Sequence, residues 1–190
     1  MVIVGITGSI AVGKSFVCDL LKGEGYKVFE ADIEVGKMLT QIELQQQIVM
    51  EFPTIFKNHE YCKKMLSQEI FADLHNLYKL EQIIHPIIKQ KAQDFVHSNP
   101  QEKIVFIEAP LLIESGMHTM CDVVWLVSAP YDVIKTRALE RENMNEEKLS
   151  MILRRQMSQE EKIKFVDTVI NTNVNVDALV LQIDKAISKL

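Results

Sequence analysis

The segment from Gly8 to Ser15 constrains the fold of this chain more than any other stretch. It fits the pattern G-x-x-x-x-G-K-[ST], the P-loop, which wraps around nucleotide phosphates. Residues 2–6 form a short, mostly β-branched apolar run that is typical of a buried strand. Residues 15–21 carry apolar side chains at helical spacing. The sequence therefore predicts a strand, a glycine turn and a helix in direct succession.

This three-part unit also predicts a phosphate site, because backbone N–H groups and the helix dipole at a helix N-terminus favour anions. We expect Lys14 to bridge the β- and γ-phosphates and the Ser15 hydroxyl to ligate Mg²⁺. A chance match of the four fixed positions in a surface turn occurs in roughly 1% of chains of this length, and the flanking elements argue against it. The predicted ATP-binding residues are Gly8, Ser9, Ile10, Ala11, Val12, Gly13, Lys14, Ser15 and Phe16.

Apolar strands alternate with helices along the rest of the chain, except for one long helical stretch. Further strands are predicted at 26–29, 104–107, 123–127 and 166–170, and helices at 33–39, 131–141, 146–157 and 176–190. Residues 42–98 have apolar side chains at spacings of three and four, which predicts a helical insertion that Pro86 interrupts or starts. The alternation predicts an α/β fold with a parallel sheet flanked by helices and ligands at the carboxyl ends of the strands.

The overall composition is that of an ordinary globular domain of 190 residues, with a net charge of −5. Nucleic-acid binders are usually strongly basic, so nucleic acid is not an expected partner. A membrane is not expected either, because no uncharged apolar run approaches the ~20 residues of a membrane span. The early strand leaves no room for a signal peptide. Cys18, Cys62 and Cys121 lack any ligand spacing, which predicts free thiols in a cytoplasmic protein.

Two acidic positions follow predicted strands at the edge expected to carry the P-loop. Asp32, in Glu30-Ala31-Asp32, could accept the proton of an attacking hydroxyl group or hold Mg²⁺ through water. It could equally cap the following helix, and spacing alone does not separate these roles. Glu108 follows an apolar strand, at the position of the acidic residue that assists Mg²⁺ in P-loop proteins. The alternative is an ordinary charged residue at the end of a strand.

The segment 134–165 is locally basic, with eight Lys or Arg residues against six Glu. Arginines flank a break at 143–145, so the two helices could close as a lid over phosphates and exclude water. The alternative is a solvated charged hairpin. His85, next to Pro86, is a candidate ligand contact or, alternatively, a buried hydrogen-bonding side chain.

With these residues in place, the chain resembles dephospho-CoA kinases almost from end to end. In that family a P-loop precedes a strand leading into Asp-Ala-Asp, which is Glu30-Ala31-Asp32 here. The later blocks of the family match His85-Pro86-Ile87-Ile88, Pro110-Leu111-Leu112-Ile113-Glu114, Arg155-Gln156 and Lys162 through Asn171.

The resemblance implies transfer of the γ-phosphoryl group of ATP, with Mg²⁺, to the 3′-hydroxyl group of dephospho-CoA. It implies a core (1–34, 99–130 and 161–190), a helical substrate region (35–98) and a lid (131–160) in a monomer or weak homo-oligomer. Asp32 is then the base, and Lys14 and Arg141 are catalytic. The implied substrate contacts are Asp32, His85, Pro110 and Leu111, and the implied lid residues are Arg137, Arg141 and Arg155.

The chain also departs from the family pattern, and two other functions remain open. Ser9, Ala11 and Val12 stand in a loop that is usually richer in glycine, although a backbone close to phosphate can need positive φ. Glu30 replaces the first Asp of the triplet. The first alternative is another P-loop small-molecule kinase, such as a nucleoside or nucleoside monophosphate kinase. The second is a GTPase-like switch, but the guanine-selecting Asn-Lys-x-Asp pattern is missing.

Overall fold

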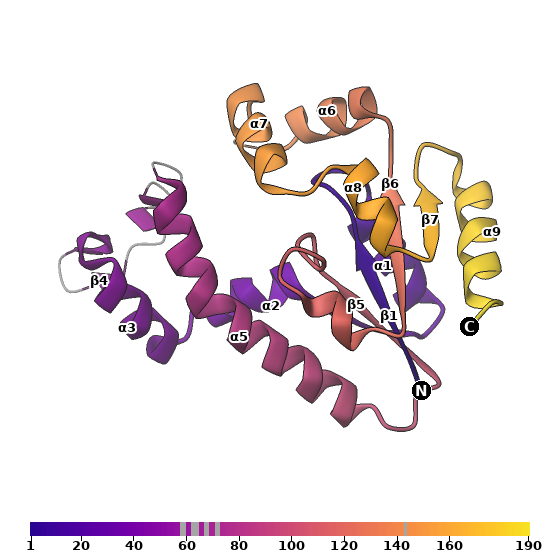
Figure 1. Cartoon of the computed structure of the whole chain (residues 1–190), viewed down its shortest axis with the longest axis horizontal. Coiled ribbons are helices and arrows are strands. Elements are labelled where there is room, and N and C mark those ends of the chain that lie inside the picture. Colours follow the sequence, from indigo (N-terminus) through magenta and orange to yellow (C-terminus); the bar gives the residue numbers. More distant parts are fainter. Residues whose placement is uncertain (58–59, 62–64, 67–68, 71–72, 143) are drawn as a thin grey trace. The chain divides into compact units, whose positions relative to one another are not determined.

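The computed structural model describes residues 1–57, 60–61, 65–66, 69–70, 73–142 and 144–190. The chain divides into two compact units, one made of residues 1–30 and 95–190 and the other of residues 31–94 (Figure 1). Cys18 and Cys121 are free thiols, as expected, whereas Cys62 lies outside the described residues. No helix in the described ranges is long and apolar enough to cross a membrane.

The first unit is built on a five-stranded sheet in the order β2-β5-β1-β6-β7. All four strand pairs are parallel, which confirms the predicted α/β class. The strands run close to their predicted bounds, as β1 (Val2–Thr7), β2 (Lys27–Glu30), β5 (Ile104–Glu108), β6 (Val123–Ser128) and β7 (Thr168–Asn171). Because the strands are parallel, their carboxyl ends share one edge, where Glu30 pairs with Glu108 in register.

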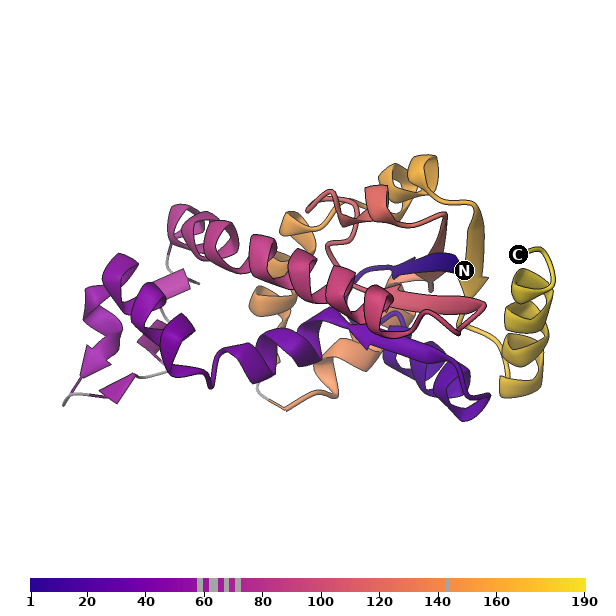
Figure 2. The same cartoon turned by 90° about the horizontal axis from the view of Figure 1, so that it is seen from below.

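The first unit also contains helices between and after these strands. They are α1 (Lys14–Gly23), α6 (Tyr131–Leu139), α7 (Glu146–Arg155), α8 (Gln159–Lys162) and α9 (Val176–Ile187), with 3₁₀ turns at Met117–Met120 and Ile163–Phe165. α9 lies beside β7 (Figures 1 and 2). One buried core joins strands, α1, α6 and α9 and includes Ile6, Phe106, Trp125, Val17, Leu21, Ile134, Leu179 and Ile183. This core fixes the P-loop between the sheet and α1.

The second unit consists mainly of helices, as predicted, with two corrections. It contains α2 (Ala31–Met38), α3 (Ile42–Glu51), a 3₁₀ turn (Pro53–Ile55) and most of α5 (Leu74–Ser98). A short antiparallel pair, β3 (Phe56–Lys57) and β4 (Glu60–Tyr61), also lies within the stretch expected to be helical. Strands of two residues are too short to leave a period in the sequence.

Pro86 does not interrupt or start a helix, contrary to the prediction, but lies inside α5. A proline in a helix removes one backbone hydrogen bond, at a cost of about 3 kcal/mol. The apolar face of α5 continues on both sides of Pro86 and is buried at Leu80, Ile84, Ile88 and Ala92. Burial of each large side chain contributes roughly 1.5–3 kcal/mol, enough together to carry the helix through the proline.

Candidate active site

The P-loop leaves β1 in a conformation that only glycine adopts easily at two positions. Gly8 has a φ of +151°, and a Cβ atom there would lie 2.3 Å from the carbonyl oxygen of Val127. Gly13 has a φ of +97° and is the N-cap of α1. The first hydrogen bond of α1 runs from the Val17 N–H to the Gly13 carbonyl, so the N–H groups of the first turn point out of the helix N-terminus.

Ala11 lies in the left-handed region with a φ of +59°. In the described part of the chain, no other non-glycine residue has a positive φ. The sequence raised this strain as a concern for the loop, and the backbone confirms it at Ala11. An L-residue in this region costs roughly 1–2 kcal/mol. Ala11 is nevertheless buried in the core cluster, and this packing helps to hold the loop closed.

Lys14 folds back over the P-loop and is almost fully buried, with 8% of its surface exposed. Its Nζ donates a hydrogen bond to the Ser9 carbonyl at 3.1 Å and lies 3.8 Å from Oε1 of Glu108. Glu108 itself is buried at the end of β5. The predicted P-loop lysine and the predicted strand-end carboxylate thus lie together.

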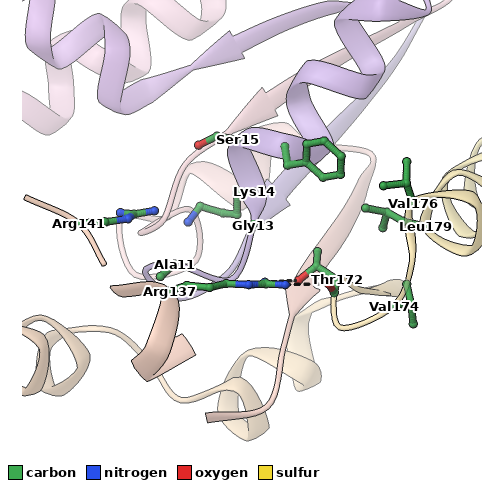
Figure 3. Close-up of a pocket in the computed structure, with 11 residues that line it drawn as sticks. Ala11, Gly13, Lys14, Ser15, Arg137, Arg141, Thr172, Val174, Val176 and Leu179 are labelled. Atoms are coloured by element: carbon green, nitrogen blue, oxygen red, sulfur yellow. Dashed lines mark hydrogen bonds between the residues drawn. The ribbon is translucent and has the colours of Figure 1, made fainter. Parts of the chain in front are cut away.

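A pocket of about 370 Å³ opens beside this loop (Figure 3). One part of its lining is polar and cationic, with Lys14, Ser15, Arg137 and Arg141. The other part is largely apolar and comes from the P-loop and the start of α1, from the segment between β7 and α9, and from the first turn of α9. The remaining lining residues are Ala11, Gly13, Phe16, Thr172, Val174, Val176 and Leu179.

The two predicted lid arginines in this pocket differ in their contacts. Arg137, on α6, donates from Nη1 to Thr172 Oγ1 at 3.1 Å and from Nη2 to the Thr172 carbonyl at 3.0 Å. Arg141 follows the end of α6 and is exposed. In Figure 3, Arg137 extends to Thr172, whereas Arg141 and Lys14 lie on the same side of the pocket. Arg137 is therefore part of the wall.

A second polar cluster lies at the end of β1, around a lysine that is completely buried. Lys162 Nζ donates to the Pro110 carbonyl at 2.6 Å and to Thr7 Oγ1 at 3.2 Å, and it lies 3.2 Å from Glu114 Oε1. Burial lowers the pKa of Lys162; the charge of Glu114 opposes this effect, and that of Lys14 adds to it. The lysine is thus held in place by three acceptors, close enough to the P-loop for the charge of Lys14 to act on it.

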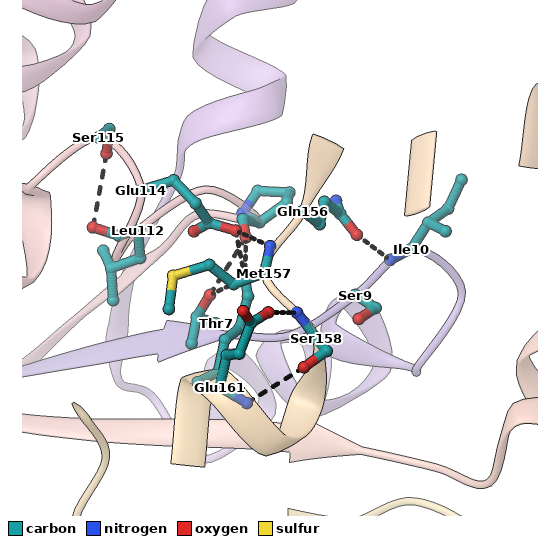
Figure 4. Close-up of polar contacts among 12 residues, drawn as sticks. Thr7, Ser9, Ile10, Leu112, Glu114, Ser115, Gln156, Met157, Ser158 and Glu161 are labelled. Carbon is teal, nitrogen blue, oxygen red and sulfur yellow. Dashed lines mark hydrogen bonds and ion pairs between the residues drawn. The ribbon is translucent and has the colours of Figure 1, made fainter. Parts of the chain in front are cut away.

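The connection between α7 and α8 is fastened to the same region (Figure 4). Glu114 Oε1 accepts a hydrogen bond from the Met157 N–H at 2.8 Å, and Gln156 Oε1 accepts one from the Ile10 N–H at 3.1 Å. Ser158 and Glu161 form a capping box that starts α8. The chain downstream of α7 is therefore tied directly to the P-loop and to the turn after β5.

Asp32 and His85 belong to the second unit. α2 begins at Ala31, two residues earlier than predicted, so the exposed Asp32 lies in the first turn of the helix and not at its N-cap. His85 is half-buried on α5. Pro110 and Leu111 lie in the turn after β5, and Arg155 is half-buried at the end of α7, all in the first unit.

Comparison with known proteins gives one consistent family. The family model for dephospho-CoA kinase matches residues 2–178. The chain belongs to the dephospho-CoA kinase family. Among curated relatives, the dephospho-CoA kinase of Bartonella henselae is 38% identical over 179 residues, covering 93% of this chain and 92% of the relative. That of Fusobacterium nucleatum is 33% identical over 187 residues, covering 97% and 96%.

Solved structures agree with this family assignment. A crystal structure from Thermus thermophilus has a TM-score of 0.87 and 28% identity, covering 99% of this chain and 96% of that one. The dephospho-CoA kinase from Campylobacter jejuni has a TM-score of 0.70 and 26% identity, covering 98% and 96%. Shikimate kinase from Acinetobacter baumannii, at a TM-score of 0.56 and 14% identity, shares the fold alone.

Sequence reasoning assigned no role to several residues of this family member's site. Thr172, Val174, Val176 and Leu179 line the pocket, but their segment follows a predicted strand without any motif. Glu114 and Lys162 entered the sequence analysis only as members of segments that resemble the family pattern. Their contact could not be predicted, because burial of a lysine depends on acceptors that are far away in the sequence. The one signal that could have indicated Thr172 is its position directly after β7, at the ligand edge of a parallel sheet.

Proposed function

We propose that this chain transfers the γ-phosphoryl group of ATP to the 3′-hydroxyl group of dephospho-CoA, giving CoA and ADP. The acceptor oxygen bonds to the γ-phosphorus, the bond to the β–γ bridging oxygen breaks, and the hydroxyl proton leaves to a base. The observation that carries this proposal is the cationic pocket at the P-loop, in a chain that matches the family model over residues 2–178.

The pocket suggests how ATP binds. Its phosphates would lie on the N-terminus of α1, where N–H groups and the helix dipole stabilise negative charge. Its base would occupy the apolar part of the lining, where Phe16, Val174 and Val176 are all partly exposed. Burial of these apolar groups against a nucleobase would add to the affinity, at about 25 cal/mol per Å².

The residues at the phosphate end also suit Mg²⁺, which prefers hard oxygen ligands and usually keeps several waters. The exposed Ser15 hydroxyl lines the pocket and would ligate the ion directly, and the Glu108 carboxylate would hold one of its waters. When bound, Mg²⁺ neutralises charge on the phosphate oxygens. Lys14 and Arg141 would supply the remaining positive charge to the group in transfer.

We assign the base to Asp32, and the acceptor contacts to Asp32, His85, Pro110 and Leu111. The position of Asp32 in the sequence supports its assignment as the base. Asp32 follows Glu30 by two residues, and Glu30 pairs with Glu108 at the carboxyl edge of the sheet. A carboxylate within hydrogen-bond reach of the attacking hydroxyl group can accept its proton. Helices α6 and α7 would form the lid, with Arg137, Arg141 and Arg155.

A coupled assay of ADP release tests the proposed function against the nearest alternatives. Dephospho-CoA, AMP and nucleosides are offered in turn as acceptors, and we expect only dephospho-CoA to support rapid turnover. A folded Lys14→Ala variant is the negative control for the P-loop. Faster turnover with AMP or a nucleoside would replace this proposal by another small-molecule kinase, and tight GTP binding with slow turnover would favour a switch.

A further inference from the structure

Among the residues that the structure describes, Lys162 is the most deeply buried charged side chain that the proposed reaction does not yet use. Its exposed fraction is 0%, and its ammonium group reaches three acceptors, on Thr7, Pro110 and Glu114. An ammonium group has three N–H donors, so the surroundings match its full hydrogen-bonding capacity. Such a group is expensive to bury unless it is fully paired, which indicates a specific requirement for it here.

The three acceptors come from two different segments of the first unit. Thr7 ends β1 and directly precedes the P-loop, whereas Pro110 and Glu114 belong to the turn after β5. Lys162 itself ends α8. Glu114 also holds the Met157 N–H, so the α7–α8 connection joins the same cluster (Figure 4). One ammonium group thus fixes these segments relative to one another.

The strand order places the turn after β5 on the side of the P-loop opposite to the nucleobase end of the pocket. The apolar lining at Val174, Val176 and Leu179 follows β7, on one side of β1. The turn with Pro110 and Glu114 follows β5, on the other side. If the base lies toward β7 and the phosphates lie along the P-loop, the γ-phosphoryl group leaves toward β5. The turn after β5 is then on the acceptor side.

We propose that Lys162 is a positioning residue for phosphoryl transfer, which holds the turn after β5 against the end of β1 so that the acceptor side of the site is formed before substrates bind. It acts through Pro110, Thr7 and Glu114 and does not touch the reacting atoms. The inference rests on the proposed function, since it requires an acceptor on the β5 side of the P-loop.

The test compares Lys162→Met, which keeps much of the length but removes the donors, with Lys162→Arg, which keeps charge and donors. For Lys162→Met we expect a rise of about tenfold or more in the acceptor KM and a fall of roughly 10–100-fold in kcat, because small misplacements of reacting groups are costly. The Kd for ATP, titrated without acceptor, should stay within about threefold of wild type. Lys162→Arg should recover part of the lost kcat. Lys164→Met, at an exposed position two residues away, is the matched control.

Two results would overturn this inference while wild type remains active on dephospho-CoA. Unchanged acceptor KM and kcat in a folded Lys162→Met protein would remove any positioning role. An equal loss of ATP affinity would place the effect on the nucleotide instead. If Lys162→Met does not fold, Glu114→Gln, which removes the charge that faces Lys162, must show the same pattern in milder form. A wild-type protein inactive on dephospho-CoA contradicts the proposed function itself, which separates the two failures.

Discussion

At the scale of single residues, position 8 of the P-loop has room only for glycine. A Cβ atom at this position would lie 2.3 Å from the backbone oxygen of Val127 in β6, which cannot rotate away. We expect Gly8→Ala to lower the free energy of unfolding by at least about 2 kcal/mol. Gly36→Ala is the matched control, because a Cβ atom there meets nothing within 4 Å and α2 should gain about 0.5–1 kcal/mol. Denaturant titration of both variants measures this, and equal stabilities would contradict the close approach of the loop to β6.

Asp32, the proposed base for phosphoryl transfer, gives a second prediction for a single residue. Asp32→Asn keeps the shape of the side chain but removes its basicity, so kcat should fall by about 10²–10⁴ while both substrates still bind. A partial recovery at high Mg²⁺ would indicate a role in holding the ion instead. The measurement is kcat across a Mg²⁺ series, with a thermal melt to check folding. A stable variant with near-normal kcat would exclude Asp32 as the base.

At the scale of elements, what the sequence predicts depends on how local the cause is. The strand, loop and helix around Gly8–Ser15 are predictable because the motif and its flanks lie within about twenty residues. The path of α5 through Pro86 is not, since buried contacts offset a local penalty. The site of Lys162 is the extreme case, because Thr7 is 155 residues away and Pro110 is 52 residues away in the chain. Neither periodicity nor motif spacing records such pairings.

Helix α6 and the residues directly after it give an element-scale prediction, because the two pocket arginines, Arg137 and Arg141, differ in what they contact. Arg141→Ala should lower kcat by about 10–100-fold with a smaller loss of ATP affinity, since its charge matters most on the group in transfer. Arg137→Ala should mainly weaken ATP binding and stability, because it removes the hydrogen bonds to Thr172. Kinetics and ATP titration of both variants are compared with Arg154→Ala, an exposed position on α7. If Arg141→Ala affects only ATP affinity, its role lies in the ground state.

At the scale of the whole molecule, two thiols in the first unit link its stability to pH. Burial raises the pKa of Cys121 from 9.0 to about 12, and the nearby charge of Asp122 adds to the shift. Burial also raises the pKa of Cys18, with further contributions from Glu108 and Glu30. Both folded-state pKa values lie above the unfolded value, so the stabilisation is complete below pH 9 and is lost as pH rises.

We therefore expect each thiol to reduce the free energy of unfolding by about 1.4 kcal/mol between pH 8 and pH 10, because the unfolded thiol ionises and the folded one does not. Denaturant titrations of wild type and Cys121→Ala at several pH values measure this slope. Cys121→Ala also loses packing against Gly5. This packing loss lowers the free energy of unfolding by the same amount at every pH, so it does not alter the pH slope. The free energy of unfolding of Cys121→Ala should fall less steeply with pH than that of wild type, by the contribution of one thiol. Cys18→Ala should behave in the same way. Parallel slopes for wild type and both variants would show that the thiols ionise in the folded protein.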